Sequence, residues 1–116
     1  MDKETLIRAG INYEEGVKRF MGKAALYERL LAELPNDETF SELERAMGAG
    51  DVQAAFQAAH ALKGMLGNLS VNGPLEQLKP LVEALRGSNL EQAATLYPSV
   101  KTALEQALNV IREEAK

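Results

Sequence analysis

The 116-residue sequence has no cysteine, no tryptophan and a single histidine, His60. Without cysteine the chain cannot form disulfide bonds, thiolate zinc sites or a thiol nucleophile, and one histidine offers few ligands to a transition metal. Aromatic residues make up only 5% of the chain, so the stacking platforms that bind single-stranded nucleic acid are scarce. We therefore expect no metal site and no nucleic-acid interface.

Long apolar runs and glycine-rich nucleotide loops are also missing. No apolar run approaches the roughly 18 residues of a membrane-spanning helix, and residues 1–4 lack the basic start and apolar core of a signal peptide. Neither the Walker nor the dinucleotide-binding glycine pattern occurs, which excludes nucleotide binding by those routes. These absences predict a cytoplasmic protein that does not interact with membranes.

The composition is that of an acidic, globular chain. The 13 lysines and arginines are outnumbered by 17 acidic residues, which gives a net charge of −4 and disfavours binding to a phosphate backbone. Apolar residues at 46% and charged residues at 26% are ordinary globular values. The length corresponds to one domain, so we expect residues 1–116 to fold as a single domain.

Composition and periodicity both predict an all-α protein. The sequence contains 17 alanines, 17 leucines and 14 glutamates against 13 β-branched residues, and no apolar alternation of period two is evident. Glycine, proline and capping residues divide the chain into expected helices at 3–9, 13–20, 23–34, 37–47, 51–69, 74–86 and 88–112. Asp37, Asp51 and Ser88 are the predicted N-caps, with Ser88 and Glu91 forming a capping box.

The last predicted helix has apolar residues spaced alternately by three and four, as in the seam of a helical bundle. They are Leu90, Ala93, Tyr97, Val100, Leu104, Ala107 and Ile111. Because the connecting loops are short, neighbouring helices should be antiparallel. The prediction is an up-down four-helix bundle with extra short helices at the N-terminus, bent locally at Pro80 and Pro98.

The stretch from residue 51 to residue 70 contains the only histidine. At about 100° per residue, one face of this helix is apolar; its members are Val52, Ala55, Ala59, Leu62 and Leu66. His60 lies away from this face and should be exposed. Its neighbours at helical spacing are Gln57, Lys63, Gly64 and Gly67.

The two glycines beside His60 are costly. Each glycine inside a helix is about 1 kcal/mol less favourable than alanine, and this helix uses alanine at many other positions. Gly64 and Gly67 therefore indicate that another molecule approaches the helix closely on the face of His60.

The chemistry of this face suits phosphoryl transfer. An exposed imidazole offers a neutral, nucleophilic nitrogen near pH 7, and Lys63, one turn along, could offset the charge of about −2 that a phosphoryl group adds. The nearest acidic residue on the same helix is Asp51, two and a half turns away. No catalytic dyad or triad is thus built locally.

The run His60-Ala61-Leu62-Lys63-Gly64, followed by Gly67-Asn68-Leu69, resembles the signature of histidine-containing phosphotransfer (HPt) domains. The run from Ile11 to Phe20 and the pairs at 26–27 and 30–31 are similar to the N-terminal half of stand-alone bacterial members. The resemblance covers roughly residues 5–112 and is specific through the first 70. Met65 and Leu66 stand where the family often has small residues, and Ser70 stands where glycine is common.

The resemblance implies a phosphocarrier rather than an enzyme. His60 would accept a phosphoryl group from the aspartyl phosphate of a response-regulator receiver domain, or from an upstream or hybrid histidine kinase, and would pass it to another receiver. Lys63 would stabilise the phosphoryl group, and the receiver docking surface would comprise Gly64, Gly67, Gln57 and Met65. The receiver would supply the aspartate and Mg²⁺, so this chain would hold no cofactor of its own. We expect it to act as a monomer.

Two other functions fit the same pattern of helices. The first is a module that docks receivers without transferring phosphate, although such a module has no need for the histidine. The second is a purely structural or oligomerising bundle, for which the two exposed glycines would be an unexplained cost. A phosphotransfer assay separates the carrier from the docking module, and a receiver-binding assay separates both from the structural bundle.

Overall fold

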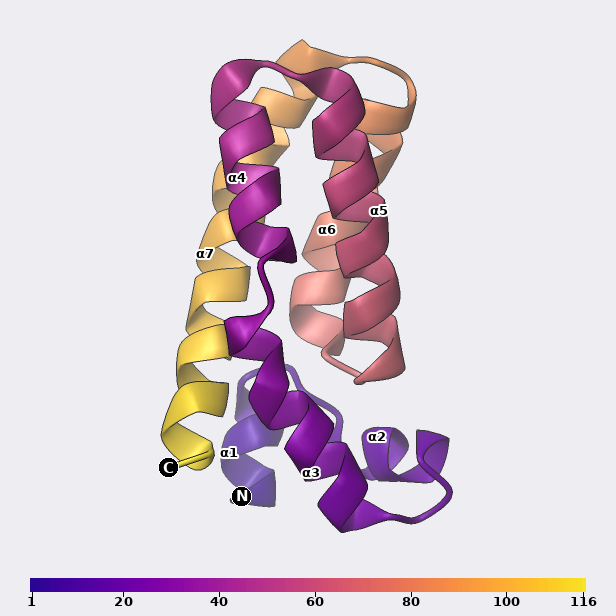
Figure 1. Ribbon diagram of the computed structural model, residues 1–116, viewed down its shortest axis with the longest axis vertical. Helices are drawn as coiled ribbons and strands as arrows, with labels where there is room; N and C mark the ends of the chain where they lie inside the picture. The colour runs from indigo at the N-terminus through magenta and orange to yellow at the C-terminus, as the bar shows by residue number, and fades with distance from the viewer.

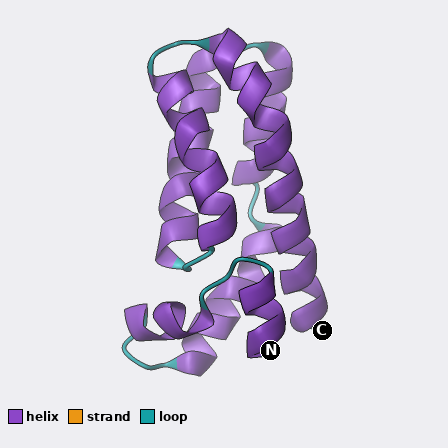
Figure 2. Ribbon diagram, turned by 180° about the vertical axis from the view of Figure 1, so that it is seen from behind, coloured by secondary structure: helices purple, strands orange, loops and turns teal.

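A computed structural model describes residues 1–116. It contains α1 (Lys3–Arg8), α2 (Tyr13–Arg19), α3 (Ala24–Glu33), the 3-10 turn η1 (Leu34–Asn36), α4 (Thr39–Ala49), α5 (Val52–Asn68), α6 (Asn72–Arg86) and α7 (Leu90–Glu114) (Figure 1). No strand is present (Figure 2). The predicted all-α class is therefore confirmed, and the predicted helices are all found, with ends shifted by a few residues.

The four longest helices, α4 to α7, form the bundle. α4 packs on α5, α5 on α6, and α6 on α7, and each helix runs opposite to the one before it (Figure 1). The short helices α1, α2 and α3 gather at one end, where the N- and C-termini also lie. The prediction of an antiparallel up-down bundle with extra N-terminal helices is thus confirmed.

One continuous cluster of 25 buried apolar residues forms the core. The seam predicted for α7 lies within it: Ala93, Val100, Leu104, Ala107 and Ile111 are buried, while Leu90 and Tyr97 are half-buried at the edge. Leu6 and Ile11, from the first turns of the chain, are fully buried in the same cluster. The short N-terminal helices therefore share the core of the bundle.

The helix ends confirm one predicted cap and correct another. The Asp51 carboxylate accepts a hydrogen bond from the Ala54 N–H at 3.1 Å, as predicted. The predicted capping box at Ser88 is wrong, because Ser88 has a left-handed backbone with φ 55° and cannot be the extended residue that an N-cap requires. The cap is the next residue, Asn89, whose side chain accepts from the Gln92 N–H at 3.0 Å.

The predicted cap at Asp37 also lies one residue outside the observed one. α4 begins at Thr39, and the residue that precedes it is Glu38, whose side chain makes no capping bond. The Asp37 carboxylate nevertheless accepts from the Thr39 N–H at 2.8 Å and from its hydroxyl at 2.6 Å. It therefore satisfies one of the donors left free at the start of the helix.

Pro80 and Pro98 lie inside α6 and α7, and both helices continue through them. Each proline lacks the N–H that would bond the carbonyl four residues earlier. Both are exposed, so these carbonyls face water rather than the apolar core. Because each proline lies on the solvent face, water can bond the unpaired carbonyl, which limits the loss of folding stability that the proline causes.

Two glycines join the N-terminal helices to the start of α6. Gly10 adopts φ 86°, and its carbonyl accepts from the Gly73 N–H at 2.9 Å. A Cβ atom on Gly10 would lie only 3.0 Å from the Gly73 Cα. Any larger residue at Gly10 would therefore be strained by its φ angle and would crowd the neighbouring backbone.

Candidate functional site

His60 lies in the middle of α5 and is exposed. The opposite face of this helix is buried against the other helices, through Ala55, Ala59, Leu62 and Leu66. The predicted division of α5 into a core face and a histidine face is thus correct. The bundle holds the backbone of His60 rigidly while its imidazole is free to meet another molecule.

An aromatic contact supports the imidazole from one side. The ring of Phe56, one turn earlier, lies with its centroid 5.6 Å from that of His60 and an angle of 33° between the rings. The guanidinium of Arg86, from α6, stands 5.0 Å from the centroid of the Phe56 ring, a cation–π distance. Phe56 packs against both the core and His60.

On the other side of His60 is a shallow depression, which we call the cationic depression. It is lined by Arg19, His60, Lys63, Gly64, Gly67, Asn68, Leu75 and Lys79. Lys63 lies one turn from His60 on α5, as its spacing predicts, and forms no ion pair within the chain. The depression therefore brings one unpaired cation to the imidazole.

The two glycines of the histidine face leave this depression open. A Cβ atom on Gly64 would meet no other atom within 4 Å, and one on Gly67 would lie 3.9 Å from a Leu75 methyl group, an ordinary contact. Packing inside the bundle therefore requires neither glycine. Their cost, about 1 kcal/mol each relative to alanine, has no compensation within the isolated chain.

Two predicted docking residues lie elsewhere. Gln57 is exposed in the groove between α4 and α5 and does not line the depression. Met65 is half-buried on another side of α5, where it lines a small apolar cavity with Leu34 and Leu104. The structure does not bring Met65 to the face of His60, because five residues correspond to about 140° of rotation around the helix.

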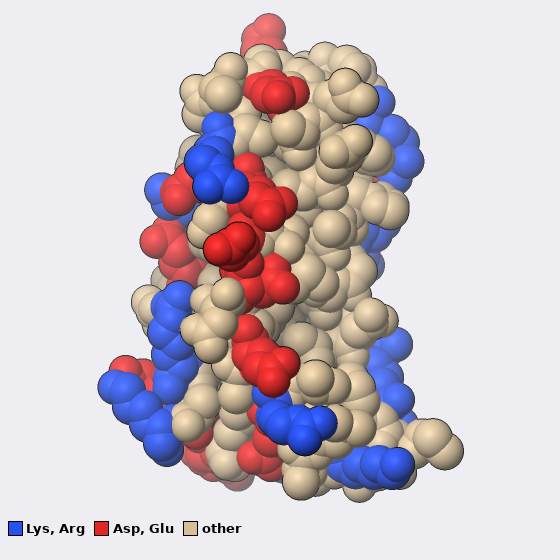
Figure 3. Space-filling model, in the orientation of Figure 1, with Lys and Arg blue, Asp and Glu red and all other residues tan.

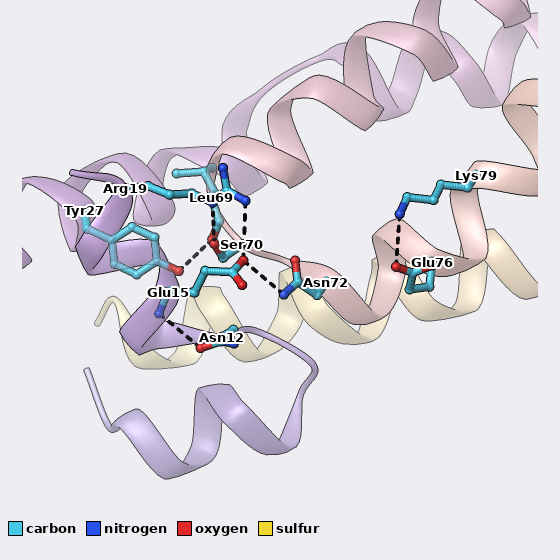
Figure 4. A network of polar contacts seen from close by, with 9 residues as sticks. All are labelled: Asn12, Glu15, Arg19, Tyr27, Leu69, Ser70, Asn72, Glu76 and Lys79. Carbon is cyan, nitrogen blue, oxygen red and sulfur yellow. Dashed lines mark hydrogen bonds and ion pairs between the residues drawn. The ribbon is translucent and has the colours of Figure 1, made fainter. Parts of the chain in front are cut away.

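Two cations of the depression come from other helices. Lys79, on α6, pairs with Glu76 at 3.1 Å. Arg19, on α2, donates from its Nε to the Ser70 hydroxyl at 3.2 Å and lies 3.6 Å from the Glu15 carboxylate (Figure 4). Sequence reasoning missed both residues because only the tertiary fold brings them to α5.

Ser70 connects α2 to the end of α5. It is fully buried and has φ 55°, a left-handed conformation that usually calls for glycine at the end of a helix. Hydrogen bonds from Ser70 and Asn72 hold the pKa of Glu15 below its usual range. Nearby, the Tyr27 hydroxyl donates to the Leu69 carbonyl at 2.7 Å, and burial raises the pKa of Tyr27 to about 12 (Figure 4).

The charges of the molecule are unevenly placed. Acidic side chains gather over α4, with several basic side chains beside them, whereas the charged side chains visible along the edge formed by α5 and α6 are mainly basic (Figure 3). The lining of the cationic depression includes three basic side chains and no carboxylate. A phosphoryl group on His60 would thus meet positive charge, and no neighbouring lining residue could serve as a carboxylate base for its hydrolysis.

Elsewhere in the chain, no group of three or more His, Asp or Glu side chains is arranged to hold a metal ion. No helix is both long enough and apolar enough to cross a bilayer.

Comparison with known protein families matches residues 25–113 to the Hpt domain. No curated protein and no solved structure matches the chain. Hpt domains are phosphocarriers rather than catalysts, and they interact with receiver domains and histidine kinases. The match spans most of the bundle, including the histidine face of α5, and the chain therefore belongs to the Hpt domain family of histidine phosphotransfer domains in phosphorelay signalling.

Proposed function

We propose that His60 is the phosphorylated residue and that the whole chain acts as one monomeric carrier domain between receivers. The observation that carries this proposal is the arrangement at α5. The only histidine of the chain is exposed on a rigid helix, beside an unpaired lysine and a strip of backbone without side chains.

The transfer follows from the chemistry of the imidazole. The lone pair of a neutral ring nitrogen of His60 attacks the phosphorus of a receiver's aspartyl phosphate. The N–P bond forms, the P–O bond breaks, and the receiver's carboxylate leaves with the electron pair. The reverse reaction loads a second receiver. The receiver contributes the aspartate and its Mg²⁺ ion.

Lys63 and Gly64 have separate parts in this proposal. The Lys63 ammonium lies one turn from His60 and offsets the negative charge that is transferred to the imidazole. Gly64 leaves the helix surface bare, so the receiver's loops can bring their aspartate within bonding distance of His60. Neither residue removes a proton, which fits a carrier that stores the phosphoryl group rather than releasing it to water.

The test is a transfer assay with a panel of receiver domains labelled at aspartate. We expect label to move from at least one receiver to the parent chain as an acid-labile adduct. His60→Gln should accept none, since glutamine has similar bulk but no nucleophilic ring nitrogen, and its helical circular dichroism should match that of the parent. Label on the His60→Gln chain would show that another residue is the acceptor. A parent chain that binds receivers but takes no label would be a docking module instead.

A further inference from the structure

We infer that Arg19 is a docking residue, which binds an acidic side chain of the receiver and acts on recognition rather than on the transfer itself. This inference rests on the proposed function and specifies which chemistry the receiver must present on the part of its surface that meets α2, away from its phosphorylated aspartate. It assigns a role in the site to α2, which lies before the part of the chain that matches the family.

The position of Arg19 excludes a direct contact with the phosphoryl group. α5 continues for eight residues after His60, to Asn68, which is about 12 Å of helix axis. Arg19 is bonded to Ser70, just beyond that end. A phosphoryl group on the imidazole extends only a few ångströms, so Arg19 does not reach it. A receiver that covers the cationic depression, however, spans both His60 and Arg19, because both line it.

Ser70 shows that Arg19 is held in place. A serine with a left-handed backbone at the end of a helix is less favourable than glycine, and Ser70 is also fully buried. Its hydroxyl accepts the Arg19 Nε–H at 3.2 Å, a contact that glycine could not make. Serine is therefore less favourable than glycine for the backbone at this position, but its hydroxyl oxygen orients the guanidinium of Arg19.

The surroundings of Arg19 leave donors free for a partner. Its Nε bonds Ser70, and one terminal nitrogen lies 3.6 Å from Glu15, itself engaged by Asn72 at 3.3 Å. A guanidinium has five N–H donors, and half of the Arg19 side-chain surface is exposed. With Lys63 and Lys79 in the same depression, the surface is complementary to a carboxylate of the partner.

The test compares Arg19→Gln with Arg29→Gln, an equal change of charge on α3. Arg29 is exposed and forms no ion pair, and it does not line the depression. The probe is the receiver that labels the parent most rapidly. We expect Arg19→Gln to weaken receiver binding about two- to fivefold, the range of an exposed ion pair, with a shallower dependence on salt. Transfer at saturating receiver should be unchanged, and Arg29→Gln should bind as the parent does.

A second variant, Ser70→Gly, removes the tether but keeps the arginine. It should also weaken receiver binding, by less than Arg19→Gln, and its thermal midpoint checks that the fold is retained. Three results would overturn the inference: parent-like receiver binding by Arg19→Gln, slower transfer by that variant at saturation, or an equal loss in Arg29→Gln. A parent chain that no receiver labels would instead refute the proposed function, so the two failures are distinct.

Discussion

Gly64 offers a perturbation in which stability and binding should move in opposite directions. A Cβ atom at this position would meet nothing within 4 Å, so Gly64→Ala should gain the full difference in helix propensity, about 1 kcal/mol, and Gly64→Leu slightly less. For a chain of this size, 1 kcal/mol raises the thermal midpoint by about 4 °C. Thermal and urea denaturation measure this gain directly.

Receiver binding should nevertheless fall. If the bare backbone at Gly64 lets receiver loops approach His60, then the leucine side chain fills space that the partner needs. We expect at least a tenfold weakening for Gly64→Leu, which is about 1.4 kcal/mol, and a smaller one for Gly64→Ala. Titration of a receiver against each variant gives these values.

Gly48 provides a matched control. It also lies within a helix, near the end of α4, and a Cβ atom there would again meet nothing within 4 Å. Gly48→Ala should stabilise the fold, to a smaller extent because helix ends are less ordered, and should leave receiver binding unchanged. Should Gly64→Leu bind a receiver as tightly as Gly48→Ala does, the close-approach argument is refuted.

Three further changes test other parts of the molecule. Lys63→Ala should slow phosphoryl transfer without lowering the urea midpoint, because the half-buried Lys63 forms no ion pair within the chain and alanine has the higher helix propensity; unchanged transfer rates would mean that the partner offsets the charge. Gly16→Ala should destabilise the fold by about 2 kcal/mol, since its Cβ atom would overlap the buried Tyr27 ring, and a parent-like urea midpoint would contradict this packing. A hydrogen bond from Tyr13 and the N-terminal ammonium hold the pKa of Glu28 below its usual range. The stability it adds is present near neutral pH and is lost in acid as the carboxylate is protonated, so the difference between the parent and Glu28→Gln should shrink from about pH 6 to about pH 3; a constant difference would exclude this linkage.

Sequence periodicity was sufficient to predict the bundle and the direction of His60, because both depend on neighbours within one helix. Counting residues at the helical period predicted which face of α5 is turned to the core, and Ala55 and Leu66 of that face are buried in the structure. The cap at Ser88 was wrong by one position because the preceding Gly87 keeps an ordinary φ of −83°. The left-handed residue is Ser88 itself, whereas residue preferences alone would assign that conformation to Gly87.

The rest of the site depends on contacts between segments far apart in the chain. Arg19 and Ser70 are separated by 51 positions. The spacing of residues within α2 or within α5 does not indicate that these two side chains meet. The departure from the family at Ser70 was visible in the sequence. The role of this serine became clear only in the structure, where its buried hydroxyl is hydrogen-bonded to an arginine.

The same long separations have a consequence for the order of folding. Pairing α4 with α5, α5 with α6 and α6 with α7 closes only short loops, whereas the polar contacts of the N-terminal helices bridge 42 positions from Tyr27 to Leu69 and 57 from Glu15 to Asn72. Contacts between distant residues carry a larger entropy of loop closure and form later. We therefore expect the bundle to assemble first and the N-terminal helices to dock onto it last, so that amide protons in α2 exchange with solvent sooner than those in α5.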